Sequence, residues 1–226
     1  MKLTQSILAV IFMVAATSCG DMKGGDNNNG GDEKPKTYGT AAEAAEAGKA
    51  DMLKAMENGV NFGVDRAKLE SSKPGQPIMK QAVDFNALLQ ADSSTNLERM
   101  TTGEAVTAVP FIIGPEVVSI MTLRNEGNQF AVGTLGDAQL STELNTVSQA
   151  TGGAAQGKVT IYEIPNLNAT VYAVGDSAGI LYYTSYNNLS PRQPLRAPEL
   201  MRMLQAEAQN FQKQFGDEIK KGKLVR

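Results

Sequence analysis

A repeated order of secondary-structure patterns constrains the fold of this 226-residue chain more than any other feature. Three segments rich in β-branched and aromatic residues precede an amphipathic helical pattern, and the same order then occurs a second time. Short turns containing Gly, Asn or Pro join the segments of each set, as is typical of antiparallel meanders. The predicted strands span 106–113, 117–123 and 130–135 in the first set, and 159–164, 169–174 and 180–186 in the second.

Each meander is followed by a segment in which apolar residues recur with the period of a helix. Asp137 caps the first helix and Gly152-Gly153 ends it, while Glu199 opens the second. We therefore predict an α+β fold: an antiparallel sheet of about six strands in two three-strand meanders, each followed by a helix. The pattern is consistent with one sheet that carries its helices on a single face, or with two half-domains. The apolar positions are Leu140, Leu144 and Val147 in the first helix, and Leu200, Met203, Leu204, Phe211 and Phe215 in the second.

An additional helix precedes the meanders. Thr40 and Glu43 form a capping-box pattern that opens an Ala-rich helix, which runs to about Asn58 and stops at Gly59. Because Gly48 interrupts a small apolar side, we expect this helix to lie at the edge of the domain. Further on, 78–83 has the composition of a strand, and a short capped helix is predicted over 84–89.

The first 19 residues have the pattern of a secretory signal: Lys2, an apolar stretch over 7–16, and small residues before Cys19, the one cysteine of the chain. Ala16-Thr17-Ser18-Cys19 resembles the lipobox of bacterial lipoproteins, although that family usually has Leu or Val where this chain has Ala16. The resemblance implies cleavage before Cys19 and a lipid on that residue. Two acyl chains suffice for stable membrane attachment. The alternative is a plain signal peptide with a cysteine there by chance.

The residues after Cys19 are nearly all Gly, Asn, Asp and Lys, which cannot bury enough apolar surface to order themselves. The acidic residues here resemble the run after the cysteine in Bacteroidota lipoproteins exported to the outer surface, which implies an outer-membrane location. We divide the chain into a signal peptide (1–18), a lipidated cysteine with a disordered tether (19–38), a helical segment (39–72), an α+β domain (73–217) and a basic tail (218–226). The acidic residues are Asp21, Asp26, Asp32 and Glu33.

Composition excludes several chemistries. Without histidine, the chain cannot form a Ser-His-Asp or Cys-His site or the usual Cys/His zinc site. A partial match to a calcium loop begins at Asp26 but has Thr37 where the bidentate Glu belongs. A net charge of −3, with basic residues clustered only near the end of the chain, gives no electrostatic footprint for nucleic acid. We predict no metal, no cofactor and no nucleic-acid partner.

Two motifs resemble catalytic ones. Gly175-Asp176-Ser177-Ala178-Gly179 fits the nucleophile elbow G-x-S-x-G, but the surrounding pattern is strand-turn-strand and no histidine can activate Ser177, so we predict a hairpin turn. The segment 152–159 comes within one residue of a P-loop, but Val159 replaces the hydroxyl residue and the segment runs from helix into strand. We assign no catalytic residue.

Two groups of polar residues are interpreted as structural. Scattered acidic residues are predicted to be helix caps or solvated side chains, since sequence alone cannot pair two carboxyls across a cleft. Tyrosines concentrated in the second meander are predicted to form cross-strand pairs with their hydroxyls at the rim of the sheet. The acidic residues are Asp84, Asp92, Glu104, Glu116, Glu143 and Glu163, and the tyrosines are Tyr162, Tyr172, Tyr182, Tyr183 and Tyr186.

The sequence favours a membrane-anchored bacterial envelope lipoprotein whose domain is a non-catalytic binding or assembly module, with another envelope protein as a potential partner. One alternative is an envelope hydrolase that acts on peptide or glycan through Ser177 or a carboxylate pair. Another is a carrier of an apolar ligand, consistent with the ten methionines.

Overall fold

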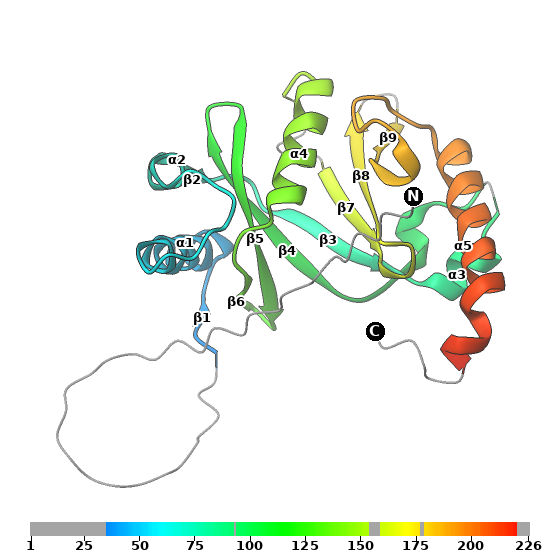
Figure 1. Ribbon diagram of the computed structural model, residues 1–226, viewed down its shortest axis with the longest axis horizontal. Helices are drawn as coiled ribbons and strands as arrows, with labels where there is room; N and C mark the ends of the chain where they lie inside the picture. Colours follow the sequence, from blue (N-terminus) through cyan, green and yellow to red (C-terminus); the bar gives the residue numbers. More distant parts are fainter. Residues whose placement is uncertain (1–34, 93, 154–158, 177–178, 221–226) are drawn as a thin grey trace, which may run out of the picture. The chain divides into compact units, whose positions relative to one another are not determined.

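The computed structural model describes residues 35–92, 94–153, 159–176 and 179–220. Nine strands of these residues form one mixed sheet, and five α-helices pack against it (Figure 1). The α+β class predicted from the sequence is confirmed. The strands are β1 (Thr37–Tyr38), β2 (Lys73–Pro74), β3 (Ile78–Val83), β4 (Thr101–Ile113), β5 (Glu116–Glu126), β6 (Gln129–Thr134), β7 (Val159–Ile164), β8 (Ala169–Asp176) and β9 (Gly179–Tyr183). The helices are α1 (Ala41–Glu57), α2 (Arg66–Ser71), α3 (Phe85–Gln90), α4 (Ala138–Ala150) and α5 (Ala197–Lys220).

Both predicted meanders are present: β4–β5–β6 is followed by α4, and β7–β8–β9 is followed by α5. The strand count and the purely antiparallel arrangement were wrong. The order across the sheet is β1-β6-β5-β4-β3-β7-β8-β9, with β2 paired to β4. Strand β3 lies between the meanders, antiparallel to β4 and parallel to β7, and thereby joins them into one sheet.

The prediction that the helices cover one face was also wrong, because strand alternation builds cores on both faces. On β8, Tyr172 and Val174 pack with α4, whereas Val171 and Ala173 pack with α5 on the opposite face. On β4 and β5, Phe111 and Met121 contribute to a third cluster, under α1 and α2. Helix α4 therefore covers one face, and the other four helices cover the two ends of the opposite face.

Helix α1 begins at the predicted capping box, in which Glu43 N donates to Thr40 Oγ1 and Thr40 N donates to Glu43 Oε2. Gly48, predicted to interrupt the apolar side, is instead its point of closest approach to the sheet. A Cβ at this position would lie 2.4 Å from Met121 Sδ on β5. The missing side chain allows α1 to pack closely on the sheet, over the end formed by β1, β6, β5 and β4.

The tether was predicted to be disordered through residue 38, but its last two residues form β1. Thr37 and Tyr38 pair with Ala131 and Phe130 of β6, and Thr37 Oγ1 donates to Gln129 Oε1 at 2.7 Å. Tyr38 packs against the α1 cluster, so burial of an aromatic ring offsets the entropy lost on pairing. The ordered part of the domain therefore begins before residue 39.

The elements on either side of the two motif-like segments are the predicted ones. Strands β8 and β9 flank 177–178 directly, and Asp176 pairs with Gly179, which has a φ of +133°. The sequence around the second motif runs from α4 into β7. Several predicted features lie outside the described residues: Ser177, residues 154–158 and 221–226, and the segment 1–34, which holds Cys19 and all of the partial calcium loop up to residue 34.

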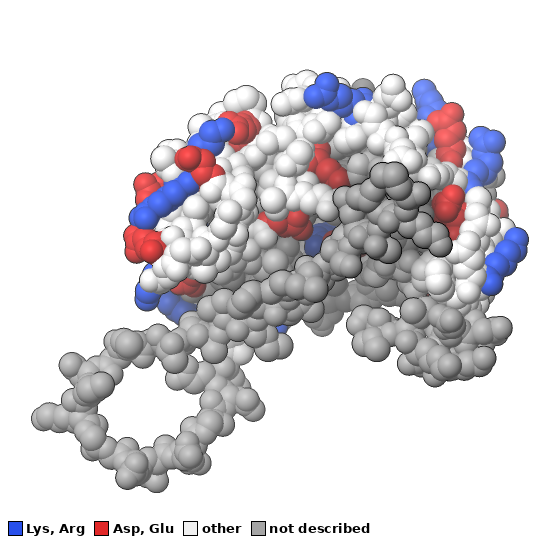
Figure 2. Space-filling model, viewed as in Figure 1, with Lys and Arg blue, Asp and Glu red and all other residues white. Residues whose placement is uncertain are grey.

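None of the helices formed by the described residues combines the length and apolar character needed to cross a membrane. On the face shown in Figure 2, acidic and basic side chains are interspersed. Several of them form exposed ion pairs on or beside α2, including Arg66 with Glu57 and Glu70, and Lys68 with Glu116.

Candidate functional site

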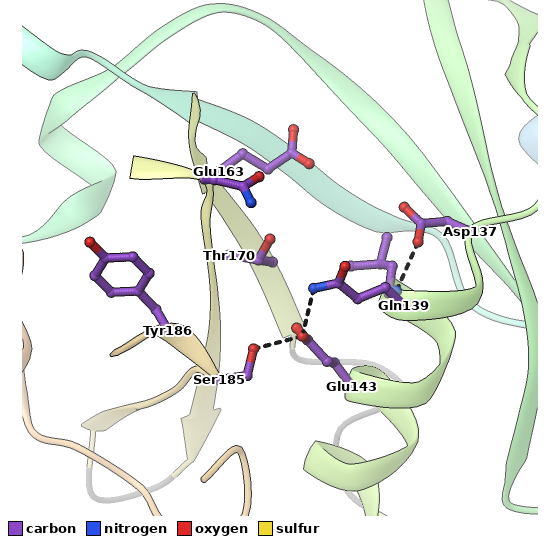
Figure 3. A pocket seen from close by; sticks show the side chains of 9 residues that line it. Asp137, Gln139, Glu143, Glu163, Thr170, Ser185 and Tyr186 are labelled. Carbon is purple, nitrogen blue, oxygen red and sulfur yellow. Dashed lines mark hydrogen bonds between the residues drawn. The ribbon is translucent and has the colours of Figure 1, made fainter. Parts of the chain in front are cut away.

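A polar cavity of about 190 Å³ lies where the N-terminal half of α4 faces β7, β8 and the segment after β9 (Figure 3). The lining residues are Asp137, Gln139, Leu140, Glu143, Glu163, Asn168, Thr170, Ser185 and Tyr186.

Glu143 is the central group of this site. It lies on α4 with only 9% of its surface exposed, although a carboxylate is among the groups most costly to bury. Three donors reach it: Tyr172 Oη donates to Oε2 at 2.9 Å, and Ser185 Oγ and Gln139 Nε2 donate to Oε1 at 2.6 and 3.1 Å. Figure 3 shows Ser185 and Gln139 directed at it. These bonds offset the desolvation of the carboxylate and fix its direction.

The donor Tyr172 is itself fully buried in β8, beneath α4. Burial raises the pKa of its hydroxyl far above the ordinary value for tyrosine, and the negative charge of Glu143 raises it further. This hydroxyl therefore stays protonated and donates to Glu143 throughout the physiological pH range.

The other two acidic side chains of the cavity also have partners. Asp137 caps α4 by accepting from Leu140 N at 2.8 Å, where the helix dipole favours a negative charge. Glu163 on β7 forms a 2.8 Å ion pair with Lys80 of β3, whose side chain is 14% exposed. Each of the three carboxylates is therefore compensated by a different part of the fold.

Three further side chains that line the cavity are not held by partners of this kind among the described residues. Asn168, Thr170 and Tyr186 form no side-chain hydrogen bond within the described part of the chain. Asn168 has a left-handed backbone (φ 50°, ψ 44°) just before β8, and Tyr186 begins the short 3₁₀ turn Tyr186–Asn188 after β9. The amide of Asn168 and the hydroxyl of Thr170 are thus available to a ligand, and each can donate and accept. Tyr186 contributes its ring, because Figure 3 shows its hydroxyl directed away from Glu143.

Sequence reasoning assigned the other acidic residues correctly in three cases. Asp84 caps α3, Asp92 accepts from Ser94 and Thr95 in a turn that lowers its pKa, and Glu116 pairs with Lys68. The side chain of Glu104 is outside the described set.

The interpretation of Glu143 as a cap or solvated residue was wrong, because it is buried at a hydrogen-bonded centre. Sequence reasoning also missed Gln139, Asn168, Thr170 and Ser185. The signal that could have found Glu143 is its position between Leu140 and Val147, on the apolar side of α4.

The tyrosine predictions hold in part. Tyr172 and Tyr183 lie directly opposite each other on β8 and β9, as a cross-strand pair requires. The Tyr172 hydroxyl is not at the rim of the sheet, however, but under α4. Tyr186 was predicted to lie in the last strand, but β9 ends at Tyr183 and Tyr186 follows it.

Comparisons with known proteins give no assignment. Neither a protein-family model, nor a curated protein, nor a solved structure matches this chain. Its function must therefore be argued from the cavity and from the sequence before the domain.

Proposed function

We propose that this chain is a bacterial envelope lipoprotein, attached to the outer membrane through a lipid on Cys19, whose domain binds a small polar ligand without catalysis. The proposed membrane location rests on the signal-like residues 1–18 and on the lipobox-like segment before Cys19. The binding function rests on one observation. A buried, immobilised carboxylate lies beside the available polar side chains of Asn168 and Thr170 in a single cavity.

The cavity favours binding over hydrolysis. A glycosidase needs one carboxyl that carries a proton for the leaving group and a second that acts as base or nucleophile. Glu143 accepts three hydrogen bonds and Glu163 forms an ion pair with Lys80, so the fold itself already engages both carboxylates. Ser185 donates to a carboxylate, which is a weak base for a serine hydroxyl.

Metabolic labelling with a palmitate analogue tests the anchor. The full chain should be labelled and should sediment with membranes, whereas Cys19→Ala should lose the label and become soluble. Ser177→Ala serves as the matched control and should retain both properties. Equal labelling of the chain and of Cys19→Ala would overturn the lipoprotein assignment.

A fluorophosphonate probe tests the serine-hydrolase alternative on the parent chain, on Ser177→Ala and on Ser185→Ala. We expect no labelling of the parent chain by this probe. Labelling that disappears in Ser177→Ala, or in Ser185→Ala, would replace the binding proposal with a hydrolase.

A further inference from the structure

We infer that the ligand of the α4 cavity is a neutral polyhydroxyl compound of the size of one sugar residue. This inference rests on the proposed binding function and specifies its ligand class. It follows from which hydrogen-bonding groups of the cavity are already occupied.

The negative charges of the cavity argue against an anionic ligand. Three carboxylates line the same small space, and Lys80, which contacts one of them, is already paired with Glu163. A phosphate or carboxylate ligand would lose its hydration and face like charges at short range.

The partners that these carboxylates already have within the fold argue against a cationic ligand. The N-terminus of α4 offsets Asp137, three donors offset Glu143, and Lys80 offsets Glu163. An ammonium group would have to compete with partners that the fold already supplies. It could also use only acceptors, leaving the donor capacity of Asn168 and Thr170 unused.

The hydroxyl groups of a neutral ligand match the hydrogen-bonding groups of the cavity that have no partner among the described residues. Each hydroxyl can donate and accept, as can the side chains of Asn168 and Thr170, and each can donate to an unused lone pair of a carboxylate. The apolar side of a sugar ring needs a surface as well. Leu140 and the ring of Tyr186 both line the cavity, and Figure 3 shows Tyr186 on the side away from α4.

Titration monitored by ¹H–¹⁵N NMR spectra of the Cys19→Ala chain tests this inference with three probes: N-acetylglucosamine, putrescine and citrate. We expect N-acetylglucosamine to shift amide signals at residues 137–143, 168–170 and 185–186, with millimolar affinity, and the other two probes to leave these signals unchanged. A single sugar offers few contacts, so weak affinity is the expected regime.

Two conservative variants locate the binding. Thr170→Val removes one hydroxyl and keeps the branched shape, and we expect it to weaken sugar binding by about fivefold, the effect of one net hydrogen bond. Its control is Thr160→Val on β7, where the half-buried side chain lies on the opposite face of the sheet and forms no side-chain hydrogen bond with described residues. We expect no change in that variant.

The outcomes separate the two proposals. If putrescine or citrate shifts the cavity signals and the sugar does not, the cavity binds ligands but the ligand class is wrong. Equal weakening by Thr170→Val and Thr160→Val would place the sugar elsewhere and overturn the inference. If no probe shifts these signals, the inference falls; if a broad library of small polar compounds also fails, the proposed binding function falls with it.

Discussion

The hydrogen bond between Tyr172 and Glu143 links the core of the sheet to the cavity. The hydroxyl of Tyr172 lies in a cluster of aliphatic side chains, yet it reaches Glu143, whose other oxygen faces Ser185. The residue thus supports the fold through its ring and the site through its hydroxyl.

Tyr172→Phe should destabilise the protein by about 1–3 kcal/mol, because it removes one of three donors to a buried carboxylate while keeping the ring. Tyr162→Phe is the matched control: its ring is also buried, but its hydroxyl has no hydrogen-bond partner among the described residues. Urea unfolding followed by circular dichroism gives both values. Equal midpoints for the two variants would contradict the role assigned to the Tyr172 hydroxyl.

Alkaline pH should destabilise the domain through the same residues. Burial, together with the charge of Glu98, raises the pKa of Tyr162 to about 12, and the pKa of Tyr172 is also raised. A tyrosine whose pKa is raised by folding stabilises the native state below the unfolded pKa of about 10 and loses that contribution as pH rises through its folded value.

The free energy of unfolding should therefore fall between pH 10 and 12, by up to about 1.4 kcal/mol per pH unit for each such tyrosine. Urea titrations across this range, with absorbance at 295 nm reporting ionisation, measure the slope. Tyr162→Phe should make it shallower. An unchanged slope in that variant would show that Tyr162 ionises normally in the native state.

At the level of secondary-structure elements, local sequence patterns correctly predicted the features that depend on interactions within a single element. The spacing of Leu140, Leu144 and Val147 correctly predicted α4, and the Thr40 capping box correctly predicted the start of α1. The position of β3 between the meanders was not predictable in this way, because its two partners are specified by packing between distant segments. The cavity escaped prediction for the same reason, since Glu143, Thr170 and Ser185 meet only after α4 folds over the sheet.

Gly48→Ala should destabilise the protein, although Ala is the better helix former by about 1 kcal/mol. The added methyl would collide with the fully buried side chain of Met121, and overpacking of this kind costs about 1–3 kcal/mol. Combining Gly48→Ala with Met121→Val, which shortens the opposing side chain, should restore part of the loss. Thermal unfolding of the two single variants and the double variant measures this coupling, and strict additivity would contradict the proposed contact.

The whole domain should unfold as one unit. Its three core clusters share strands, and β3 contributes Ile78 to one cluster and Val83 to another, so the meanders are not separate half-domains. Leu69 and Leu204 belong to the clusters at opposite ends of the sheet.

Leu69→Ala and Leu204→Ala should each cost about 2–5 kcal/mol, because both side chains are fully buried, and both variants should keep a single unfolding transition. Calorimetry measures the number of transitions. A second transition in either variant would show that the two ends fold independently.

The central position of β3 also determines the order in which the sheet can be completed during synthesis. Its neighbour β4 follows within the same stretch of chain, but the residue opposite Met79 on its other side is Thr160, far along the sequence. Until β7 emerges, β3 presents an unpaired edge, which favours association with other chains. The long-range closure also slows folding. A chain with this topology therefore passes through a period in which its sheet is incomplete and it needs protection from aggregation.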